Sequence, residues 1–205
     1  MQLVLLFEVK PKPEAFDEYL AIAARLRPSL DESGGCLFID RFRSVREPAR
    51  ILSYQIWRDE AALVKWRVNA QHHKAQTLGR TQVFDDYRLR VAQVLLQESG
   101  DGEWRPDRLS TYNDPNVRPA RYLVIAESRQ ALTHSSMDSA ESYESLYRPG
   151  EYATVMDVRQ LSSAPRLADL EGAFRLRFCE TERDYGMFDR SESPQYYPPR
   201  DRVTA

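Results

Sequence analysis

The sequence has 205 residues, enough for one large domain or two small ones with a buried core. Its formal net charge is −2 and it contains no basic block, which argues against a nucleic-acid partner. The longest apolar runs have the length of a strand, and the N-terminus lacks the pattern of a signal peptide, so we expect neither a membrane span nor secretion. Cys36 and Cys179 stand apart without metal-ligand spacing, which is typical of a reduced, cytoplasmic protein.

The chain opens with signals for a strand followed by a helix. Residues 3–9 form a short apolar run that predicts a buried strand. Pro13 suits the first turn of a helix, and from Glu14 onward apolar side chains recur at helical spacing. We expect Pro28 to kink or end this helix, and the Ser-Gly-Gly segment at 33–35 to stop whatever continues.

The next segments predict a hairpin, a second helix and a fourth strand. Residues 36–43 alternate, and with residues 51–57 they read as a hairpin. Asp59 is a suitable N-cap for a helix that extends toward Gly79. Residues 87–95 alternate again. The resulting order, βαββαβ, is that of a ferredoxin-like unit.

The second half repeats the strands of the first half but not its helices. Residues 143–159 align without gaps over 42–58, and residues 174–177 repeat the pattern of 87–90. These matches predict a duplication in which about one helix is missing between the first two strands and about a dozen residues between the last two. The segments at 135–139 and 162–165 read as loops. The alternative is that the second half forms an independent small domain.

The fold class predicted from this pattern is α+β. Tandem ferredoxin-like units would pack sheet against sheet in an arrangement of the dimeric α+β-barrel type, with the helices of the second unit shortened or missing. The predicted domains are a complete unit at 1–98, a linker at 99–120, a degenerate second unit at 121–182, and an extended Tyr- and Pro-rich arm at 183–205. We expect the arm to lie on the surface of this chain or of a partner.

Several motifs of the first half resemble the antibiotic biosynthesis monooxygenase family. They lie at residues 56–62, 66–67, 72, 79–80, 84 and 86–91. The resemblance covers residues 1 to about 97, and in the second half it extends only to the strands. It implies a dimeric α+β barrel with a pocket between sheet and helices. Members of the family include cofactor-independent oxygenases of anthrones and phenols, but the fold does not fix the function.

The resemblance also implies catalytic residues on the second helix. An oxygenase without a cofactor needs a dry pocket, a base, and donors aimed at the developing oxyanion. Trp66 matches the family's pocket tryptophan, and His72 matches its histidine, which would act as base or hydrogen-bond donor. On an unbroken helix, however, His73 would share the face of Trp66. We prefer His72, because a change of pitch near Asn69 would bring it to that face. The plainer alternatives are a core tryptophan and two exposed histidines at a helix end.

Further candidates for substrate binding are Asn69, Tyr54, Phe38 and Phe7. Asn69 would bond a ligand or merely cap a break in the helix. Tyr54 shares a sheet face with Leu52 and Ile56, and its hydroxyl would reach the cavity or be satisfied within the core. Phe7, Phe38 and Tyr54 together would line the cavity or fill it.

The sequence predicts neither a metal nor another cofactor. Neighbouring helical residues such as His72 and His73 diverge and do not jointly hold one ion. The family's haem-degrading branch has an asparagine where this chain has Phe7, and a later histidine where it has Gln76. The chain also lacks a Gly-rich nucleotide loop and a G-x-S-x-G nucleophile motif.

We therefore expect a cofactor-independent monooxygenase that acts on an aromatic or polyketide-type small molecule with dioxygen. The family habit and the aromatic arm favour a homodimer. A non-oxidative binding protein, cyclase or isomerase would use the same pocket. A structural or regulatory member would instead fill the cavity with its own side chains.

Overall fold

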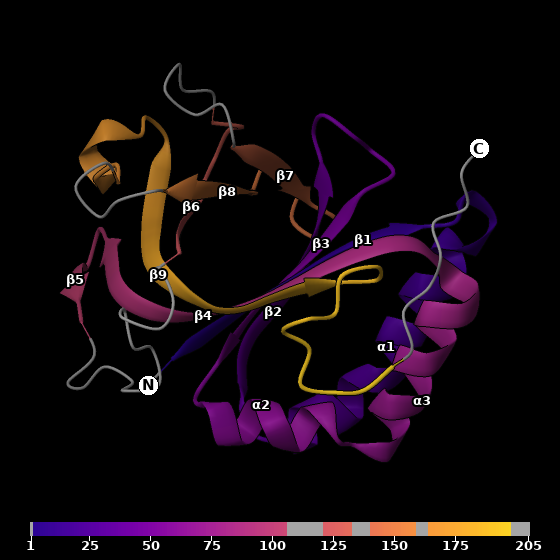
Figure 1. Ribbon diagram of the computed structural model, residues 1–205. Coiled ribbons are helices and arrows are strands. Elements are labelled where there is room, and N and C mark those ends of the chain that lie inside the picture. The colour runs from indigo at the N-terminus through magenta and orange to yellow at the C-terminus, as the bar shows by residue number, and fades with distance from the viewer. Residues whose placement is uncertain (1, 106–120, 133–139, 159–163, 198–205) are drawn as a thin grey trace.

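The computed structural model describes residues 2–105, 121–132, 140–158 and 164–197 (Figure 1). The strands are β1 (Leu3–Pro11), β2 (Cys36–Ser44), β3 (Ile51–Trp57), β4 (Phe84–Ser99), β5 (Gly102–Trp104), β6 (Tyr122–Ser128), β7 (Glu141–Ser145), β8 (Tyr152–Val158) and β9 (Ala173–Gly186). The helices are α1 (Phe16–Glu32), α2 (Glu60–Arg67) and α3 (Ala70–Leu78), with short 3-10 turns at Pro13–Ala15 and Leu167–Asp169 and a π-helical turn at Gly79–Val83. No helix within these residues is long and apolar enough to cross a membrane.

The first half has the predicted ferredoxin-like order, and its first helix continues past Pro28 to the predicted stop. α1 runs through Pro28 to Glu32, so the proline does not end it. Pro28 and Ala24 are both exposed, and water can therefore bond the Ala24 carbonyl that proline leaves without a donor. The helix stops at the predicted place, where Gly34 adopts a φ of +69°.

The predicted second helix is divided in two. Asp59 caps α2 as expected, accepting a hydrogen bond of 2.8 Å from the Ala62 amide. α2 ends at Arg67, and Asn69 then caps α3 by accepting hydrogen bonds of 3.0 Å from the amides of Gln71 and His72. Asn69 has an extended ψ of 130°, so the helix direction changes at this residue. This is the change of pitch that the sequence led us to expect.

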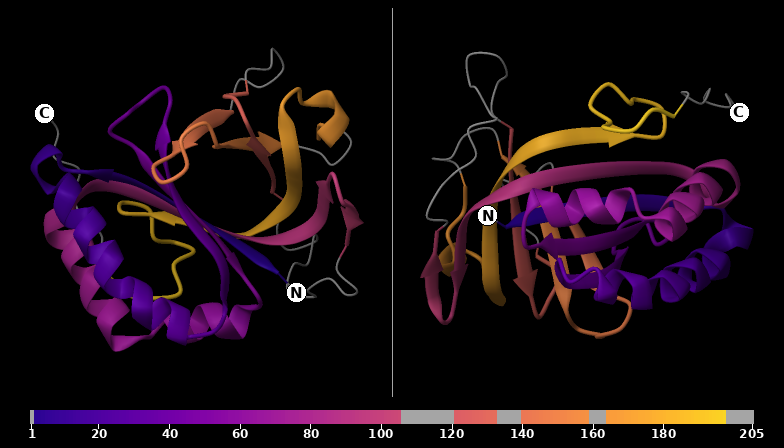
Figure 2. Two further views of the ribbon diagram at one scale, coloured as in Figure 1. Left: turned by 180° about the vertical axis from the view of Figure 1, so that it is seen from behind. Right: turned by 90° about the horizontal axis from the view of Figure 1, so that it is seen from below.

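The sheet closes into a barrel within one chain. Its strand order is β1-β3-β2-β7-β8-β6-β9-β4, and β4 returns to pair with β1. Neighbouring strands in this circuit pair antiparallel, including at the two seams between the halves, β2 with β7 and β4 with β9. Figures 1 and 2 show α1, α2 and α3 gathered on the outside of the first half, while β6 to β9 curve round to complete the barrel.

Two predicted boundaries shift because strands extend into them. β4 continues to Ser99, and β5 folds back on it with Gln97 opposite Trp104, so the start of the predicted linker belongs to the sheet. β9 continues to Gly186 and takes the first four residues of the predicted arm. The remainder of the linker from 106 to 120, the loops at 135–139 and 162–163, and the arm from 198 onward lie outside the described residues.

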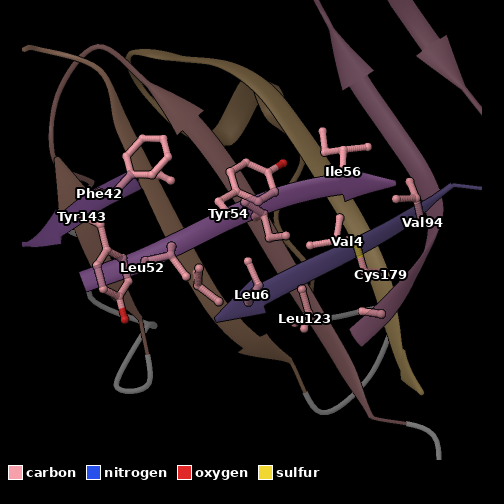
Figure 3. Packing of buried hydrophobic residues seen from close by; sticks show 14 residues of the cluster. Val4, Leu6, Phe42, Leu52, Tyr54, Ile56, Val94, Leu123, Tyr143 and Cys179 are labelled. Carbon is pink, nitrogen blue, oxygen red and sulfur yellow. The ribbon is translucent and has the colours of Figure 1, made fainter. Parts of the chain in front are cut away.

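The barrel interior is a continuous apolar core contributed by both halves. It consists of Val4, Leu6, Phe42, Leu52, Tyr54, Ile56, Ala92, Val94, Leu123, Ile125, Tyr143, Ala153, Val155 and Cys179. Figure 3 shows these side chains converging from the strands on either side. Because successive side chains on a strand face opposite ways, each strand of the first half keeps its other face for the helices.

The two halves meet in a reciprocal register. The sequence alignment sets Phe42 beside Tyr143 and Ser44 beside Ser145. In the sheet, Phe42 lies opposite Ser145 and Ser44 lies opposite Tyr143. Residues at corresponding positions of the two strands therefore make corresponding contacts across this seam. Continued along the strands, the alignment of 87–90 with 174–177 sets Val91 beside Phe178 and Leu96 beside Arg183. In the sheet, Val91 lies opposite Arg183 and Leu96 lies opposite Phe178, so the contact between β4 and β9 is reciprocal as well.

Two buried ion pairs also occupy matching positions in the two halves. Glu8 on β1 accepts a 2.6 Å hydrogen bond from Arg90 on β4 and another of 3.2 Å from the Tyr143 hydroxyl. Glu127 on β6 pairs with Arg177 on β9 and accepts a 3.2 Å hydrogen bond from the Tyr54 hydroxyl. Each tyrosine belongs to the opposite half from its glutamate, so these networks bridge the seams.

We expect Arg177→Met to lower the free energy of unfolding by about 3 kcal/mol, because it removes the buried guanidinium partner of Glu127 and leaves that carboxylate with the half-buried Arg175, at 2.8 Å, as its cationic partner. Urea denaturation measures this change. The control is Arg105→Met, which breaks an exposed pair with Glu103 and should cost less than about 0.5 kcal/mol. A loss below about 1 kcal/mol in Arg177→Met would show that the barrel does not depend on this pair.

Candidate active site

A cavity of about 430 Å³ lies between the outer face of the first-half sheet and the helices. Its floor is formed by two rows of side chains that run across neighbouring strands. One row is Arg41, Ser53, Phe7, Leu89 and Tyr185, and the other is Ile39, Gln55, Leu5, Val91 and Arg183. The middle of the floor is therefore apolar, and its polar groups stand at the two edges.

The roof of the cavity comes from the three helices. α1 contributes Tyr19, Ala23 and Leu26, while α2 and α3 contribute Leu63, Trp66, His72 and Gln76. Trp66 is buried and packs in one cluster with Leu5 and Val91 of the floor. It is therefore the aromatic group that covers β1 and β4.

His72 is held against Trp66 in a defined orientation. The two rings stack with their centroids 4.5 Å apart and an interplanar angle of 17°. The Nδ1 atom lies 3.0 Å from the Trp66 carbonyl oxygen. A carbonyl oxygen can only accept, so Nδ1 carries the proton and the lone pair of the neutral ring is on Nε2.

The environment of His72 keeps the imidazole neutral. Burial lowers its pKa to about 4, and the hydrogen bond to Trp66 only partly opposes this effect. At neutral pH the ring is thus an uncharged acceptor in the wall of an apolar cavity. Such a group can take a proton from a bound molecule or orient it by accepting a hydrogen bond.

His73 lies outside the cavity, contrary to its inclusion among the catalytic candidates. It is exposed on the outer side of α3, where its Nδ1 atom stands 3.1 Å from the Tyr197 hydroxyl. The break at Asn69 is the reason, since it rotates α3 relative to α2 and places His72 beside Trp66.

The predicted substrate-binding residues divide between the two faces of the sheet. Phe7 lies in the cavity floor as expected. Tyr54 and Phe38 point into the barrel interior, where their rings meet edge to face at 5.4 Å, so the expectation that they line the cavity is wrong. Successive side chains of a strand point to opposite faces of the sheet, and the residues on either side of Tyr54 in β3, Ser53 and Gln55, lie in the cavity floor. Asn69 is used as the helix cap and is not part of the cavity wall.

The C-terminal segment closes one side of the cavity, which the sequence did not reveal. Met187, at the start of this segment, is buried, and its carbonyl accepts a 3.1 Å hydrogen bond from Arg80. Arg190 donates to the Tyr87 hydroxyl at 2.8 Å and to the Gln195 carbonyl at 3.1 Å. Arg190, Gln195 and Tyr197 then complete the cavity wall. A segment without periodicity gives no signal for such packing. Its tyrosines indicated only that it would lie on a protein surface.

Within the described residues, no group of three or more His, Cys, Asp and Glu side chains is placed to hold a metal ion. His72 is the histidine of the cavity wall, and its Nδ1 atom is already used by the Trp66 carbonyl.

The fold and the cavity together define an α+β barrel protein with a cavity between its sheet and its helices. A family model described as antibiotic biosynthesis monooxygenase matches residues 2–78. A protein of Pyricularia oryzae (strain 70-15), named jasmonate monooxygenase ABM, is 32% identical over 214 residues, which cover 95% of this chain and 98% of the relative. The chain belongs to the antibiotic biosynthesis monooxygenase family.

Solved structures give more distant likenesses. Rv0793 from Mycobacterium tuberculosis is 14% identical, with a TM-score of 0.41, and the match covers 44% of this chain and 92% of that one. A structure described as an antibiotic biosynthesis monooxygenase is 22% identical, with a TM-score of 0.40, over 44% of this chain and 96% of its own. An anthrone oxidase-like protein is 12% identical, with a TM-score of 0.39, over 95% of this chain and 96% of its own.

We expect the His72 imidazole to titrate near pH 4 rather than near its ordinary value of 6.5. The unfolded chain then binds a proton at this residue that the folded chain does not bind. The free energy of unfolding should consequently fall as the pH drops from 6.5 toward 4, by up to about 1.4 kcal/mol per pH unit. His72→Gln should remove this part of the slope in urea denaturation. A ring carbon of His72 that titrates near 6.5 in NMR spectra would contradict the burial argument.

Proposed function

We propose that this protein is a monooxygenase that binds a small, mostly apolar molecule in the cavity and oxidises it with dioxygen. The observation that carries the proposal is the His72 ring, which stacks on Trp66 and is oriented by the Trp66 carbonyl in the wall of a largely apolar cavity. Family membership supports the same class of reaction. The substrate class that the sequence favoured, an aromatic or polyketide-type compound, suits an apolar floor of Leu5, Phe7, Leu89 and Val91.

The proposed chemistry needs no metal or flavin when the substrate supplies all the electrons. In an anthrone, an activated CH₂ group gives a proton to the Nε2 atom of His72, and the resulting carbanion reduces dioxygen. The overall change is R₂CH₂ + O₂ → R₂C=O + H₂O, which is balanced without an external reductant. The apolar walls keep water away from the reactive anion.

The named activity of the Pyricularia relative suggests a second substrate class, a small carboxylic acid such as jasmonate. Hydroxylation of an ordinary C–H bond gives C–OH and water, and this step consumes two electrons and two protons beyond those of the substrate. A requirement for an added reductant therefore distinguishes this reaction from the oxidation of an activated CH₂ group. A protein that binds such molecules without consuming oxygen would be the non-oxidative binding protein, cyclase or isomerase of the alternative reading.

We also propose that residues 121–182 descend from a second copy of the first unit in which the helices are shortened or missing. The reciprocal register at both seams and the matching pairs Glu8–Arg90 and Glu127–Arg177 support this origin. The homodimer stays a prediction. Since the barrel contacts are made within the chain, a second copy would have to use another surface. The cytoplasmic location likewise stays a prediction, supported by two unpaired cysteines.

The test of the oxygenase proposal is oxygen uptake with anthrones, naphthols and catechols, and with jasmonate in the presence and absence of a reductant such as ascorbate. We expect uptake with at least one compound above the uncatalysed rate. His72→Ala should lower it by at least about 100-fold, because the variant loses the base. His73→Ala is the matched control, since it removes an exposed imidazole from the same helix, and it should stay within about twofold of wild type.

Equal losses in the two variants would remove His72 from the mechanism but keep the activity. Binding of these compounds in calorimetry without any oxygen uptake would instead favour the non-oxidative alternative.

A further inference from the structure

The charged side chains that line the cavity are all arginines. They are Arg27, Arg41, Arg67, Arg80, Arg183 and Arg190, and no Asp or Glu is among the described lining residues. The whole chain has a net charge of −2, so this positive lining is a local feature. A cavity with such walls concentrates anions.

Most of these arginines are held by the protein itself. Arg27 is paired with Asp31 at 2.8 Å, and Arg183 with Glu60 at 2.9 Å. Arg80 and Arg190 both donate to the Tyr87 hydroxyl. They therefore shape the cavity wall more than they offer free donors.

Arg41 and Arg67 differ from these four, because neither a salt bridge to an acidic side chain nor a hydrogen bond to a carbonyl oxygen is found for their guanidinium groups in the described part of the chain, and Arg41 is the one of the two that lies on the cavity floor. The Arg41 Nε atom is buried without a hydrogen-bond partner in that part of the chain. The guanidinium stands 5.8 Å from the ring centroid of Tyr19 and interacts with the buried Tyr19 hydroxyl, whose own proton has no acceptor among the described residues. A buried donor without an acceptor costs about 1–3 kcal/mol, so this place is suited to an acceptor that the described residues do not provide.

Ser53 adds a third donor at the same end of the cavity. It is Arg41's partner on the neighbouring strand, and only 2% of it is exposed. The Trp57 ring donates to the Gln55 side-chain oxygen at 2.9 Å, so the Gln55 amide nitrogen donates in turn to the Ser53 oxygen at 3.1 Å. The Ser53 oxygen is thus used as an acceptor, and its proton remains available to a ligand.

We propose that Arg41, Ser53 and Tyr19 form a binding site for the carboxylate of an organic acid, which anchors the substrate of this cavity. The guanidinium fork matches the two oxygens of a carboxylate, and the two hydroxyls supply further donors. Burial raises the pKa of Tyr19, so its hydroxyl stays protonated at neutral pH and can donate. This inference rests on the proposed function and narrows its substrate to a carboxylic acid.

The sheet geometry sets the size of that acid. Arg41 is on β2, and the strand beneath Trp66 is β1, with β3 between them. Two strand spacings are about 10 Å, so the body of the molecule must cross this distance to reach His72. The floor along this path is Ser53 and Gln55 of β3, followed by Phe7 and Leu5 of β1. A ring with a short acidic side chain fits this layout, whereas a simple short-chain acid does not reach the histidine.

The experiment compares acids with their neutral methyl esters by isothermal titration calorimetry under nitrogen. The probes are jasmonate with methyl jasmonate, and 1-naphthylacetate with its methyl ester. In wild type we expect at least one acid to bind roughly tenfold or more tightly than its ester. Arg41→Gln should weaken the binding of that acid by roughly 10- to 100-fold and change the binding of the ester by less than about threefold.

Arg43→Gln is the matched control, because Arg43 lies on the same strand outside the cavity wall and stacks on Phe16. It removes the same charge and should keep the preference for the acid. Should Arg41→Gln fail to fold, Ser53→Ala tests the same site, with an expected loss of roughly three- to tenfold in acid binding.

Equal affinity for acid and ester in wild type, or an unchanged preference in Arg41→Gln, would overturn the proposal. So would a loss in Arg67→Gln that is absent from Arg41→Gln, since it would place the acid at the other side of the cavity. The assay contains no oxygen. Failure of the oxygenase proposal therefore leaves this result readable, and a loss of the acid preference leaves the oxygenase proposal intact.

Discussion

Because β1 pairs with both β3 and β4, the strands of the first half have one face inside the barrel and the other face toward the helices. In a closed barrel the inner face of every strand must contribute to a single core, and only the outer face remains for a ligand. On β1, Val4 and Leu6 enter the barrel core, while Leu5 and Phe7 form the cavity floor. A shift of register by one residue would exchange these two sets, so the cavity depends on the same backbone pairing that closes the barrel.

The two halves contribute unequally to the site because, in the described residues, the α-helices lie on the first half. The outer face of the first half lies under α1, α2 and α3, which stand far enough from the sheet to leave the cavity. On the outer face of the second half, Leu170 and its neighbours pack directly against Val124, Met156 and Phe178. In the described residues, then, the second half supplies strands that complete the barrel, and through β9 and the segment after it, one wall of the cavity.

The sequence predicted what depends on local periodicity and missed what depends on contacts distant in the chain. The strands at 36–44 and 51–57 and the Asp59 cap follow from short patterns. His72 rather than His73 lies in the cavity wall because Asn69 is a strong N-cap in the middle of an apparent helix. The error with Tyr54 was one of alternation, since its place beside Leu52 and Ile56 already set it on the face opposite Ser53 and Gln55. The roles of Arg41 and Arg190 follow from partners that no local pattern identifies.

Arginines contribute both to the stability of the barrel and to the positive charge of the cavity wall. Inside the barrel, Arg90 and Arg177 are matched by glutamates, so the low-dielectric core carries little uncompensated charge. In the cavity, Arg190 is held by the Tyr87 hydroxyl and by backbone carbonyls, which accept hydrogen bonds without cancelling the positive charge. Neutral acceptors therefore fix this side chain while its field remains available to a ligand. A neutral His72 is consistent with this environment, because burial disfavours the charged imidazole and a further cation would add to the positive charge of the guanidinium groups in the wall. An anionic ligand would reverse that balance, since its charge would offset the guanidinium groups and make a proton on Nε2 less costly. The same arginines that attract an acid would then help His72 to accept the proton that the proposed reaction removes.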